Sequence, residues 1–222
     1  MIKACLFDLD GTLLNTITTI AHYANYALCE HGIDPIEVDE YRYFVGNGAK
    51  KLVERMLRHR NVYSEETYHK IYKCYMESYD ANPTHLTEPY PGILEMLSAL
   101  KKRDIAVGVI SNKPDFATRA VCKAKFPDGA LDFVRGQVEG VPIKPDIAGP
   151  MEVLSHLGAD AANTVYIGDT AVDMLTGANL GSYKVGVSWG FRPREELIES
   201  GADKIVDLPL EIIDIIDSLN SK

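Results

Sequence analysis

The sequence predicts an α/β protein built on a doubly wound parallel sheet, with a small α-helical unit inserted after the first strand. Short apolar segments alternate with helical segments after residue 83, which is typical of a parallel sheet covered by helices on both faces. Residues 16–82 interrupt this alternation and show helical spacing alone. Acidic or polar residues directly follow several apolar segments, at the sheet edge where α/β proteins bind ligands.

The N-terminal third of the chain begins with one strand and continues as helices. The run over residues 2–7 is apolar and short, as expected of a buried strand. Thr16 is placed to cap a helix that ends near Gly32, because threonine favours N-caps and glycine favours helix ends. Apolar residues at helical spacing predict two further helices, around residues 52–57 and 68–75.

The remainder of the chain alternates between helices and strands. We expect helices over residues 93–100, 146–156 and 208–219 and after Asp173, and strands over residues 105–110, 133–135, 164–167 and 183–187. The pattern predicts an α/β core domain formed by residues 1–15 and 83–222, and a helical domain formed by residues 16–82. Two short connections, near residues 14–17 and 80–85, are the expected hinges.

Composition and charge limit the class of partner and the compartment. The formal net charge of −9 argues against nucleic acid or an acidic membrane as the main partner. The four cysteines are far apart and form no C-x-x-C pair, which favours reduced thiols over disulfides or a zinc site. Met1 leads straight into the first strand, and no segment holds the roughly 18 uninterrupted apolar residues of a membrane span. We therefore expect a soluble, cytoplasmic protein.

Two carboxylates stand at the end of the first strand. Asp8 and Asp10 are separated by Leu9, whose side chain is expected on the opposite face. Gly11 allows the backbone to turn and leaves its N–H open to an anion, and Thr12 follows it. Two solvated aspartates in an ordinary turn would give the same local pattern. The functional interpretation therefore depends on the downstream segments.

Three downstream segments carry polar residues at comparable positions. Ser111 and Asn112 follow a strand, Lys144 precedes a proline, and Asp169 follows another strand. Asp173 lies four residues after Asp169 at the start of a helix, so the two can share a face. Each segment alone also has a structural interpretation: a strand-end cap, a surface lysine, or acidic residues that favour a helix dipole.

Taken in order, the four segments resemble the haloacid dehalogenase superfamily. The resemblance rests on Asp8 to Thr12, Ser111-Asn112, Lys144-Pro145 and Gly168 to Asp173. It implies a Rossmann-like core, and the helical insertion resembles the type 1 cap of this superfamily. Both implications agree with the spacing of the apolar residues.

The resemblance implies a Mg²⁺ site at the sheet edge. Asp8 would be the nucleophile and also a metal ligand, with the backbone carbonyl of Asp10 and the carboxylate of Asp169 as further ligands. Asp173 would lie beside the metal or bind it. The residues themselves also favour a cation, because four crowded carboxylates repel one another and Mg²⁺ prefers oxygen ligands.

The resemblance also implies roles in phosphoryl transfer. The side chain of Asp10 would protonate the leaving alcohol and then deprotonate the attacking water. Lys144 would offset the charge of Asp8 and of the phosphoryl group. The implied phosphate-binding residues are Gly11, Thr12, Ser111 and Asn112. Lys113, next to this group, is expected to be solvated.

The helical unit is expected to contact the substrate. Residues 45–51 look like the substrate loop of phosphoglycolate phosphatases in the superfamily. Gly46 and Gly48 permit a tight loop ahead of a helix whose N-terminal N–H groups favour an anion, and Lys50 adds positive charge. A solvated helix face is the alternative for the basic residues of this region.

Together with these residues, the resemblance implies a Mg²⁺-dependent phosphatase of small phosphorylated metabolites, most like phosphoglycolate phosphatase. It would act through an aspartyl phosphate, as a monomer or homodimer. The alternatives are a phosphomutase of the β-phosphoglucomutase type and an inorganic pyrophosphatase with the same cap type. The acid at Asp10 favours phosphoryl transfer over dehalogenation or phosphonate hydrolysis. A non-catalytic binding protein would be expected to have lost Asp8, Asp10 or Lys144.

Overall fold

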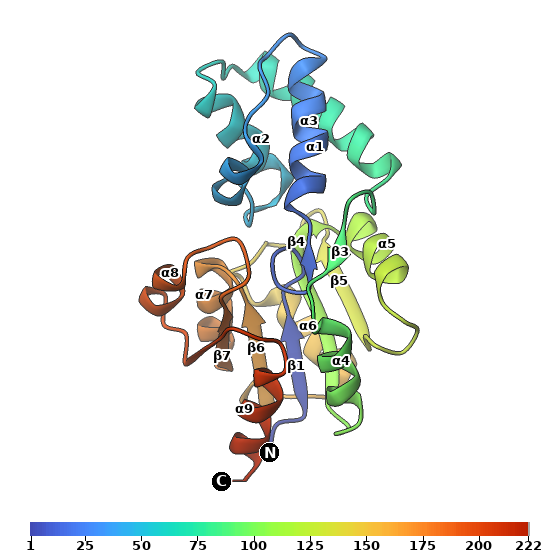
Figure 1. Cartoon of the computed structure of the whole chain (residues 1–222), viewed down its shortest axis with the longest axis vertical. Helices are drawn as coiled ribbons and strands as arrows, with labels where there is room; N and C mark the ends of the chain where they lie inside the picture. The colour runs from blue at the N-terminus through green and yellow to red at the C-terminus, as the bar shows by residue number, and fades with distance from the viewer. Residues whose placement is uncertain (222) are drawn as a thin grey trace.

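The computed structural model describes residues 1–221, which form a six-stranded sheet, a two-stranded sheet and the helices around them (Figure 1). The strands are β1 (Ala4–Phe7), β2 (Leu14–Asn15), β3 (Glu88–Pro89), β4 (Ala106–Pro114), β5 (Phe133–Gln137), β6 (Thr164–Gly168), β7 (Tyr183–Val187) and β8 (Lys204–Val206). The α-helices are α1 (Ile17–Cys29), α2 (Gly48–His59), α3 (Glu65–Ala81), α4 (Ile93–Lys101), α5 (Asp115–Lys125), α6 (Ala148–Leu157), α7 (Ala171–Leu180), α8 (Arg194–Glu199) and α9 (Glu211–Asn220). Two 3₁₀ helices complete the chain, η1 (Val38–Tyr43) and η2 (Ala161–Asn163).

The larger sheet confirms the predicted doubly wound parallel architecture. Its strand order is β5-β4-β1-β6-β7-β8, and every neighbouring pair is parallel. Strand β1 lies in the interior of the sheet, between β4 and β6, and its four residues have no exposed surface. The segment after β1 therefore leaves the sheet between the ends of β4 and β6.

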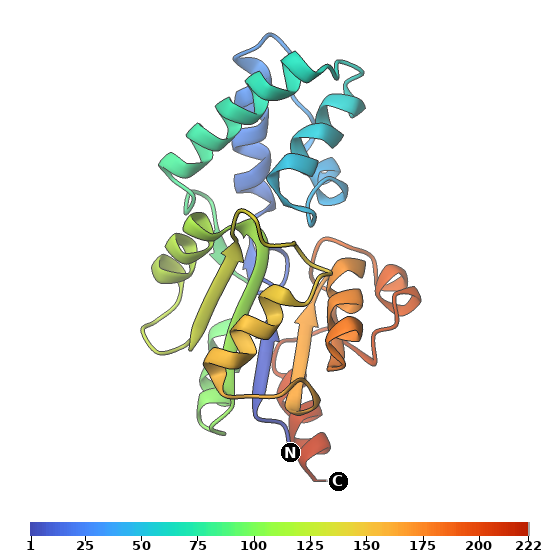
Figure 2. The same cartoon turned by 180° about the vertical axis from the view of Figure 1, so that it is seen from behind.

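Side chains of β1 alternate between two apolar layers. Cys5 and Phe7 pack in the layer formed with α4, α5 and α9, whereas Leu6 packs in the layer formed with α6 and α7. Figures 1 and 2 show these two sets of helices on opposite faces of the sheet. Because side chains alternate along a strand, Asp8 follows the direction of Leu6. It therefore faces the side on which α6 and α7 lie.

Helices α1, α2 and α3 pack on one another beyond the carboxyl end of the sheet (Figure 1). Their apolar cluster is separate from the two layers of the sheet, apart from Ala117 of α5 and Phe191, which join it from the α/β part. Where the chain enters and leaves this unit, β2 and β3 pair antiparallel, with Leu14 opposite Pro89. The sequence indicated connections here but not this small sheet.

Most elements match their sequence-based expectations, and the differences have local causes. Helix α1 begins after Thr16 as predicted, but it ends at Cys29 and the Thr16 side chain makes no capping hydrogen bond. The strand expected to stop at residue 110 continues to Pro114, because pairing with β5 resumes at Pro114 after a shift in register. Ser111 and Asn112 therefore lie within β4 and do not follow its end.

Besides β2, β3 and the two 3₁₀ helices, the sequence interpretation missed α5, α8 and β8. The buried face of α5 includes Ala117 and Thr118, which give little apolar contrast, and α8 and β8 are short. All four cysteines are free thiols, as expected. Within residues 1–221, no helix combines the length and the hydrophobicity that a membrane crossing requires.

Candidate active site

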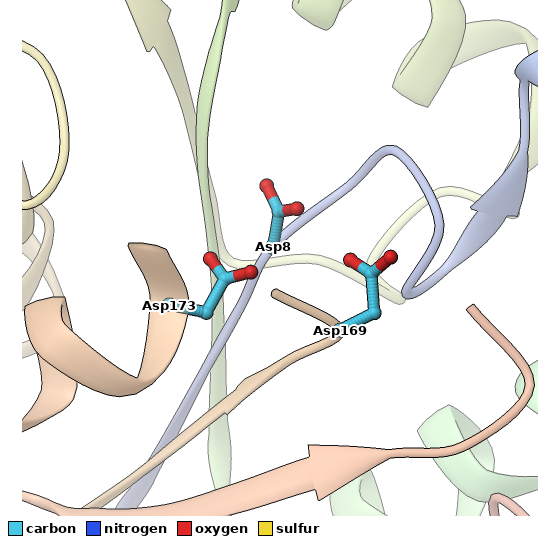
Figure 3. A group of neighbouring side chains, drawn as sticks. All are labelled: Asp8, Asp169 and Asp173. Atoms are coloured by element: carbon cyan, nitrogen blue, oxygen red, sulfur yellow. The ribbon is translucent and has the colours of Figure 1, made fainter. Parts of the chain in front are cut away.

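Three buried aspartates converge at the carboxyl end of the sheet (Figure 3). Asp8 directly follows β1, Asp169 directly follows β6, and Asp173 lies in the first turn of α7. Each offers a carboxylate oxygen, and the three oxygens lie within 4.8 Å of one another. Strands β1 and β6 are parallel neighbours, which brings their ends together. The structure thus groups three acids, of which Asp8 and Asp173 are 165 residues apart in the sequence (173 − 8).

Lys144 is the cation of this group. Its Nζ donates to Asp8 Oδ1 at 2.7 Å and to Asp173 Oδ1 at 2.8 Å. Burial disfavours its charge, but the carboxylates of Asp173 and Asp8 outweigh that effect and raise the pKa of Lys144 well above its usual value. The ammonium is therefore charged and fixed between the two acids.

Asp173 uses both oxygens within the protein. Oδ1 accepts from Lys144, and Oδ2 accepts from the backbone N–H and the hydroxyl of Thr170 at 3.1 and 2.7 Å. Thr170 and Asp173 together form a capping box that starts α7. Gly168 makes room for this carboxylate, since a Cβ there would lie 2.2 Å from the Asp173 Cβ. This geometry suits a residue that positions Lys144.

Asp169 accepts hydrogen bonds from two segments that are distant in the sequence, the turn after β1 and the loop after β7. Its Oδ1 accepts from the Thr12 hydroxyl at 3.1 Å, and its Oδ2 accepts from the Phe191 N–H at 2.8 Å. Burial raises the pKa of Asp169 well above its usual value, and the nearby charges of Asp173 and Asp8 raise it further. The two hydrogen bonds oppose this shift only in part.

Asp8 has a similarly elevated pKa. Burial is the largest cause, the Lys144 charge opposes it, and the charges of Asp173 and Asp10 add to it, giving a pKa of about 7. When ionised, the three carboxylates outnumber the one ammonium, and the raised pKa values of Asp8 and Asp169 show the cost of that excess negative charge. A hard divalent cation with oxygen ligands fits this donor set, and Asp8 and Asp169 are the carboxylates best placed to hold it.

The turn after β1 differs from its sequence interpretation. The N–H of Gly11, expected to be open to an anion, donates to the Leu14 carbonyl at 2.9 Å. The Thr12 hydroxyl donates to Asp169. Gly11 has a φ of +91°, and a Cβ there would lie 2.3 Å from Asp169 Oδ2. Thr12 therefore holds Asp169, and Gly11 leaves room for it. The expectation that the Gly11 N–H is open to an anion is wrong, because the turn uses it, whereas a phosphate contact by Thr12 stays a prediction.

Asn112 joins three segments of the site. Its Oδ1 accepts from the Lys144 backbone N–H at 2.9 Å, and its side-chain NH₂ donates to the carbonyls of Gly46 and Lys144 at 2.9 and 3.2 Å. The Ser111 Oγ accepts from the Lys113 N–H at 3.2 Å, which leaves the hydroxyl proton free to donate. Asn112 thus links the lysine segment to the loop that precedes α2.

A pocket lies between the helical unit and the sheet. Its lining from the α/β part includes Asp8, Asp10, Ser111, Asn112, Lys113 and Pro114. Its lining from the helical unit includes Ile20, Val45, Gly46, Gly48, Ala49, Leu52, Tyr75, Met76 and Tyr79. Gly46 and Gly48 therefore border the pocket, and their contact with substrate stays a prediction. Lys50 is exposed and does not line it, so a contact between Lys50 and substrate remains a prediction.

The expectation that Lys113 is solvated is wrong. Its side chain is only 5% exposed, and its Nζ lies 2.9 and 3.2 Å from the two carboxylate oxygens of Asp10. It also lies 4.8 Å from the centre of the Tyr79 ring, which α3 contributes. One sequence feature could have indicated this burial: Lys113 stands two residues after Ser111, and β4 continues through both of them to Pro114.

The raised pKa of Asp8 predicts how pH affects the stability of the metal-free protein. Because the folded-state pKa of about 7 exceeds the usual 3.8, protonated Asp8 stabilises the fold below about pH 4. This contribution is lost as pH rises through about 7. Mg²⁺ would bind the ionised carboxylates, so we expect it to raise Tm by several degrees more at about pH 8 than at about pH 5.

Thermal denaturation at both pH values, with and without Mg²⁺, measures this effect. The control is Asp8→Asn, which cannot titrate at this position and should weaken the metal-free pH dependence, leaving the part that comes from Asp169. An equal Mg²⁺ effect on wild-type Tm at both pH values would contradict the prediction.

Gly11→Ala tests the close approach to Asp169. The new methyl group would displace the Asp169 carboxylate, and we expect the apparent Mg²⁺ affinity to fall about tenfold or more. Gly140→Ala is a matched control, since Gly140 also has a positive φ of +79° but has no other group within 4 Å. Calorimetric titration with Mg²⁺ compares the two variants. Equal affinities would remove the proposed link between Gly11 and Asp169.

Comparison with known proteins supplies independent information. A sequence model of the haloacid dehalogenase-like hydrolase family matches residues 5–187. The chain is 30% identical over 218 residues to N-acetylmuramic acid 6-phosphate phosphatase of Pseudomonas aeruginosa, covering 97% of this chain and 95% of that one. It is also 30% identical over 209 residues to phosphoglycolate phosphatase of Pseudomonas fluorescens, covering 92% and 76%.

A further sequence relative and a solved structure also match the chain over nearly its whole length. A Clostridium perfringens protein named "putative pyrophosphatase" is 30% identical to this chain over 230 residues, and the alignment covers 100% of both chains. A crystal structure of a "putative phosphoglycolate phosphatase" from Lactobacillus delbrueckii subsp. bulgaricus superposes with a TM-score of 0.91 at 29% identity, covering 96% of this chain and 98% of that one. The fold, the convergent aspartates and these matches together establish that the chain belongs to the haloacid dehalogenase-like hydrolase family.

Proposed function

We propose that the chain is a Mg²⁺-dependent phosphatase that hydrolyses small phosphate monoesters through an aspartyl phosphate on Asp8. The observation that carries this proposal is the position of Asp8. It borders the pocket, one of its oxygens is held by Lys144, and its other oxygen accepts no hydrogen bond from residues 1–221. A carboxylate oriented in this way is suited to attack an electrophile in the pocket.

The first half-reaction transfers the phosphoryl group to Asp8. The unpaired oxygen of Asp8 attacks phosphorus, the bond from phosphorus to the leaving oxygen breaks, and that oxygen takes a proton from Asp10. Lys144 keeps its charge and offsets the negative charge that gathers around Asp8. Ser111 borders the pocket and offers a hydroxyl proton to a phosphoryl oxygen.

The second half-reaction regenerates the enzyme. Asp10 takes a proton from water, the water oxygen attacks phosphorus, and the bond between phosphorus and the Asp8 oxygen breaks. The products are phosphate and free Asp8, and Asp10 is protonated again for the next cycle. One residue thus serves as acid and then as base, as its place in the pocket allows.

The metal would be held by the carboxylates of Asp8 and Asp169 together with the backbone carbonyl of Asp10. Bound there, Mg²⁺ supplies positive charge that reduces the repulsion between the Asp8 carboxylate and the phosphate dianion. Asp173 would act through Lys144, since both of its oxygens already have protein donors.

The helical unit, residues 16–82, would act as a cap domain over the sheet. It supplies most of the apolar pocket wall, and the β2–β3 pair is the natural boundary for its movement. We infer a small phosphorylated metabolite as substrate, with phosphoglycolate as the first candidate. We also infer a cytoplasmic location, consistent with the four free thiols, and a monomer or homodimer.

Pyrophosphate is a second candidate substrate, favoured by the full-length match to the Clostridium perfringens protein. A sugar phosphate is a third, because N-acetylmuramic acid 6-phosphate is the substrate in the name of another relative. A mutase of the β-phosphoglucomutase type remains an alternative from the sequence.

Phosphate release from a panel of phosphometabolites tests the proposed function. The panel includes phosphoglycolate, pyrophosphate, N-acetylmuramic acid 6-phosphate and a hexose 1-phosphate, each with and without Mg²⁺. We expect Mg²⁺-dependent phosphate release, with a preferred monoester. Conversion of the hexose 1-phosphate to the 6-phosphate without release would favour a mutase. No turnover of any compound by the folded protein would contradict a phosphatase.

Two aspartate variants test the assigned roles. Asp8→Asn should abolish turnover while the protein remains folded. Asp10→Asn should slow an alkyl phosphate by about 10² to 10⁴-fold, and an aryl phosphate with a good leaving group much less in the first half-reaction. Burst kinetics separate the half-reactions. Normal turnover of the alkyl phosphate by Asp10→Asn would remove its role as the acid.

A further inference from the structure

Lys113 is a buried cation that the proposed mechanism does not use. It lies on β4 next to Ser111 and Asn112, which also border the pocket, and Asp10 is its ion-pair partner. Its Nζ also lies over the Tyr79 ring, 4.8 Å from the ring centre. An ammonium that is 5% exposed is costly to bury unless its charge is used or compensated. Asp10 compensates this charge, and because an ammonium has three donors, Lys113 can also bind a group in the pocket.

The surroundings of Lys113 define one side of the pocket. Among the pocket-lining residues in the described chain, Lys113 is the one with a basic side chain. The opposite wall is largely apolar and comes from the helical unit, with Ile20, Leu52, Tyr75, Met76 and Tyr79. The Tyr79 hydroxyl is buried and has no hydrogen-bond partner within residues 1–221. A ligand in this pocket therefore meets one positive charge beside an aromatic and apolar surface.

The position of Lys113 relative to Asp10 indicates which part of a substrate it would meet. In the proposed mechanism Asp10 gives its proton to the leaving oxygen, so that oxygen must come within hydrogen-bond distance of Asp10. The Lys113 Nζ is 2.9 Å from one Asp10 oxygen and 3.2 Å from the other. It is therefore close to the first few atoms of the leaving group, and not to the transferred phosphoryl group, which Lys144 and Asp8 face.

We propose that Lys113 is a specificity-determining residue that binds a carboxylate on the leaving group, one carbon away from the carbon that carries the ester oxygen. This assignment rests on the proposed phosphatase function. An ammonium has three donors, so it can contact such a carboxylate while it keeps Asp10 as a partner. Its burial strengthens the attraction, because little water screens the charges.

In this assignment the residue that binds the charged group of the substrate lies on the sheet and not on the helical unit. Lys50 was the basic residue expected to bind the substrate, but it is exposed and outside the pocket lining. Lys113 lies on β4, and its ion-pair partner Asp10 lies in the turn after β1, so both belong to the α/β part of the chain. The helical unit would instead limit the size of the leaving group with its apolar side chains.

The test compares two substrates that differ in one group. In 2-phosphoglycolate the leaving group carries a carboxylate, and in 2-hydroxyethyl phosphate a neutral CH₂OH replaces it. We expect wild type to prefer the carboxylate by about tenfold or more in kcat/KM. Lys113→Met should lower that preference about 10- to 100-fold, the usual effect of losing a hydrogen bond to a charged group.

The specificity ratio separates recognition from general damage. Lys113→Arg keeps the charge and should retain most of the preference, and Lys102→Met removes an exposed lysine and should leave the ratio unchanged. If Lys113→Met lowers both rates equally, Lys113 serves only to position Asp10 and the assignment is overturned. If that variant does not fold, the wild-type ratio decides, because a ratio near one also overturns it.

Failure of the phosphatase proposal would look different. Wild type that releases phosphate from neither of these compounds, nor from any other monoester, would end the proposed function. Wild type that hydrolyses both compounds at equal rates would leave the phosphatase intact and overturn only the role of Lys113.

Discussion

The site depends on one buried ammonium shared by two carboxylates from different parts of the chain. Lys144 binds Asp8 at the end of β1 and Asp173 at the start of α7, at 2.7 and 2.8 Å. Removing any one of these three residues leaves a buried charge uncompensated, so the positions of Asp8, Lys144 and Asp173 depend on one another. With Asp169 added, one positive charge faces three acids, and a divalent cation would complete the balance.

A second constraint ties the helical unit to this group. Asn112 donates to the Gly46 carbonyl and also holds the Lys144 backbone, so the loop before α2 and the lysine segment share one amide. Arg192 donates to the carbonyls of Arg42 and Val45, and its neighbour Phe191 holds Asp169. The segments that position the acids are thus the ones that contact the helical unit. A movement of the helical unit would therefore change the positions of the acids.

The sequence predicted the parts of the site that depend on strand ends. Asp8 and Asp169 follow strands of a parallel sheet, and that topology alone brings them together. It could not predict Lys113, because the residue is buried by Tyr79 from a helix 34 residues earlier in the chain (113 − 79) and by Asp10 from another strand end. The Gly11 N–H was misjudged for a different reason, because the turn is closed locally by its hydrogen bond to the Leu14 carbonyl, three residues later. Contacts that depend on how separate units pack leave no periodic signal.

The most direct test of the central claim is to trap the covalent intermediate. Rapid acid quenching during turnover, followed by peptide mass spectrometry, locates any phosphoryl group on the chain. The account predicts a phosphoryl group on the peptide that contains Asp8, with none on Asp10, Asp169 or Asp173. Phosphorylation of a different residue, or turnover with no phosphorylated peptide at any quench time, would contradict it.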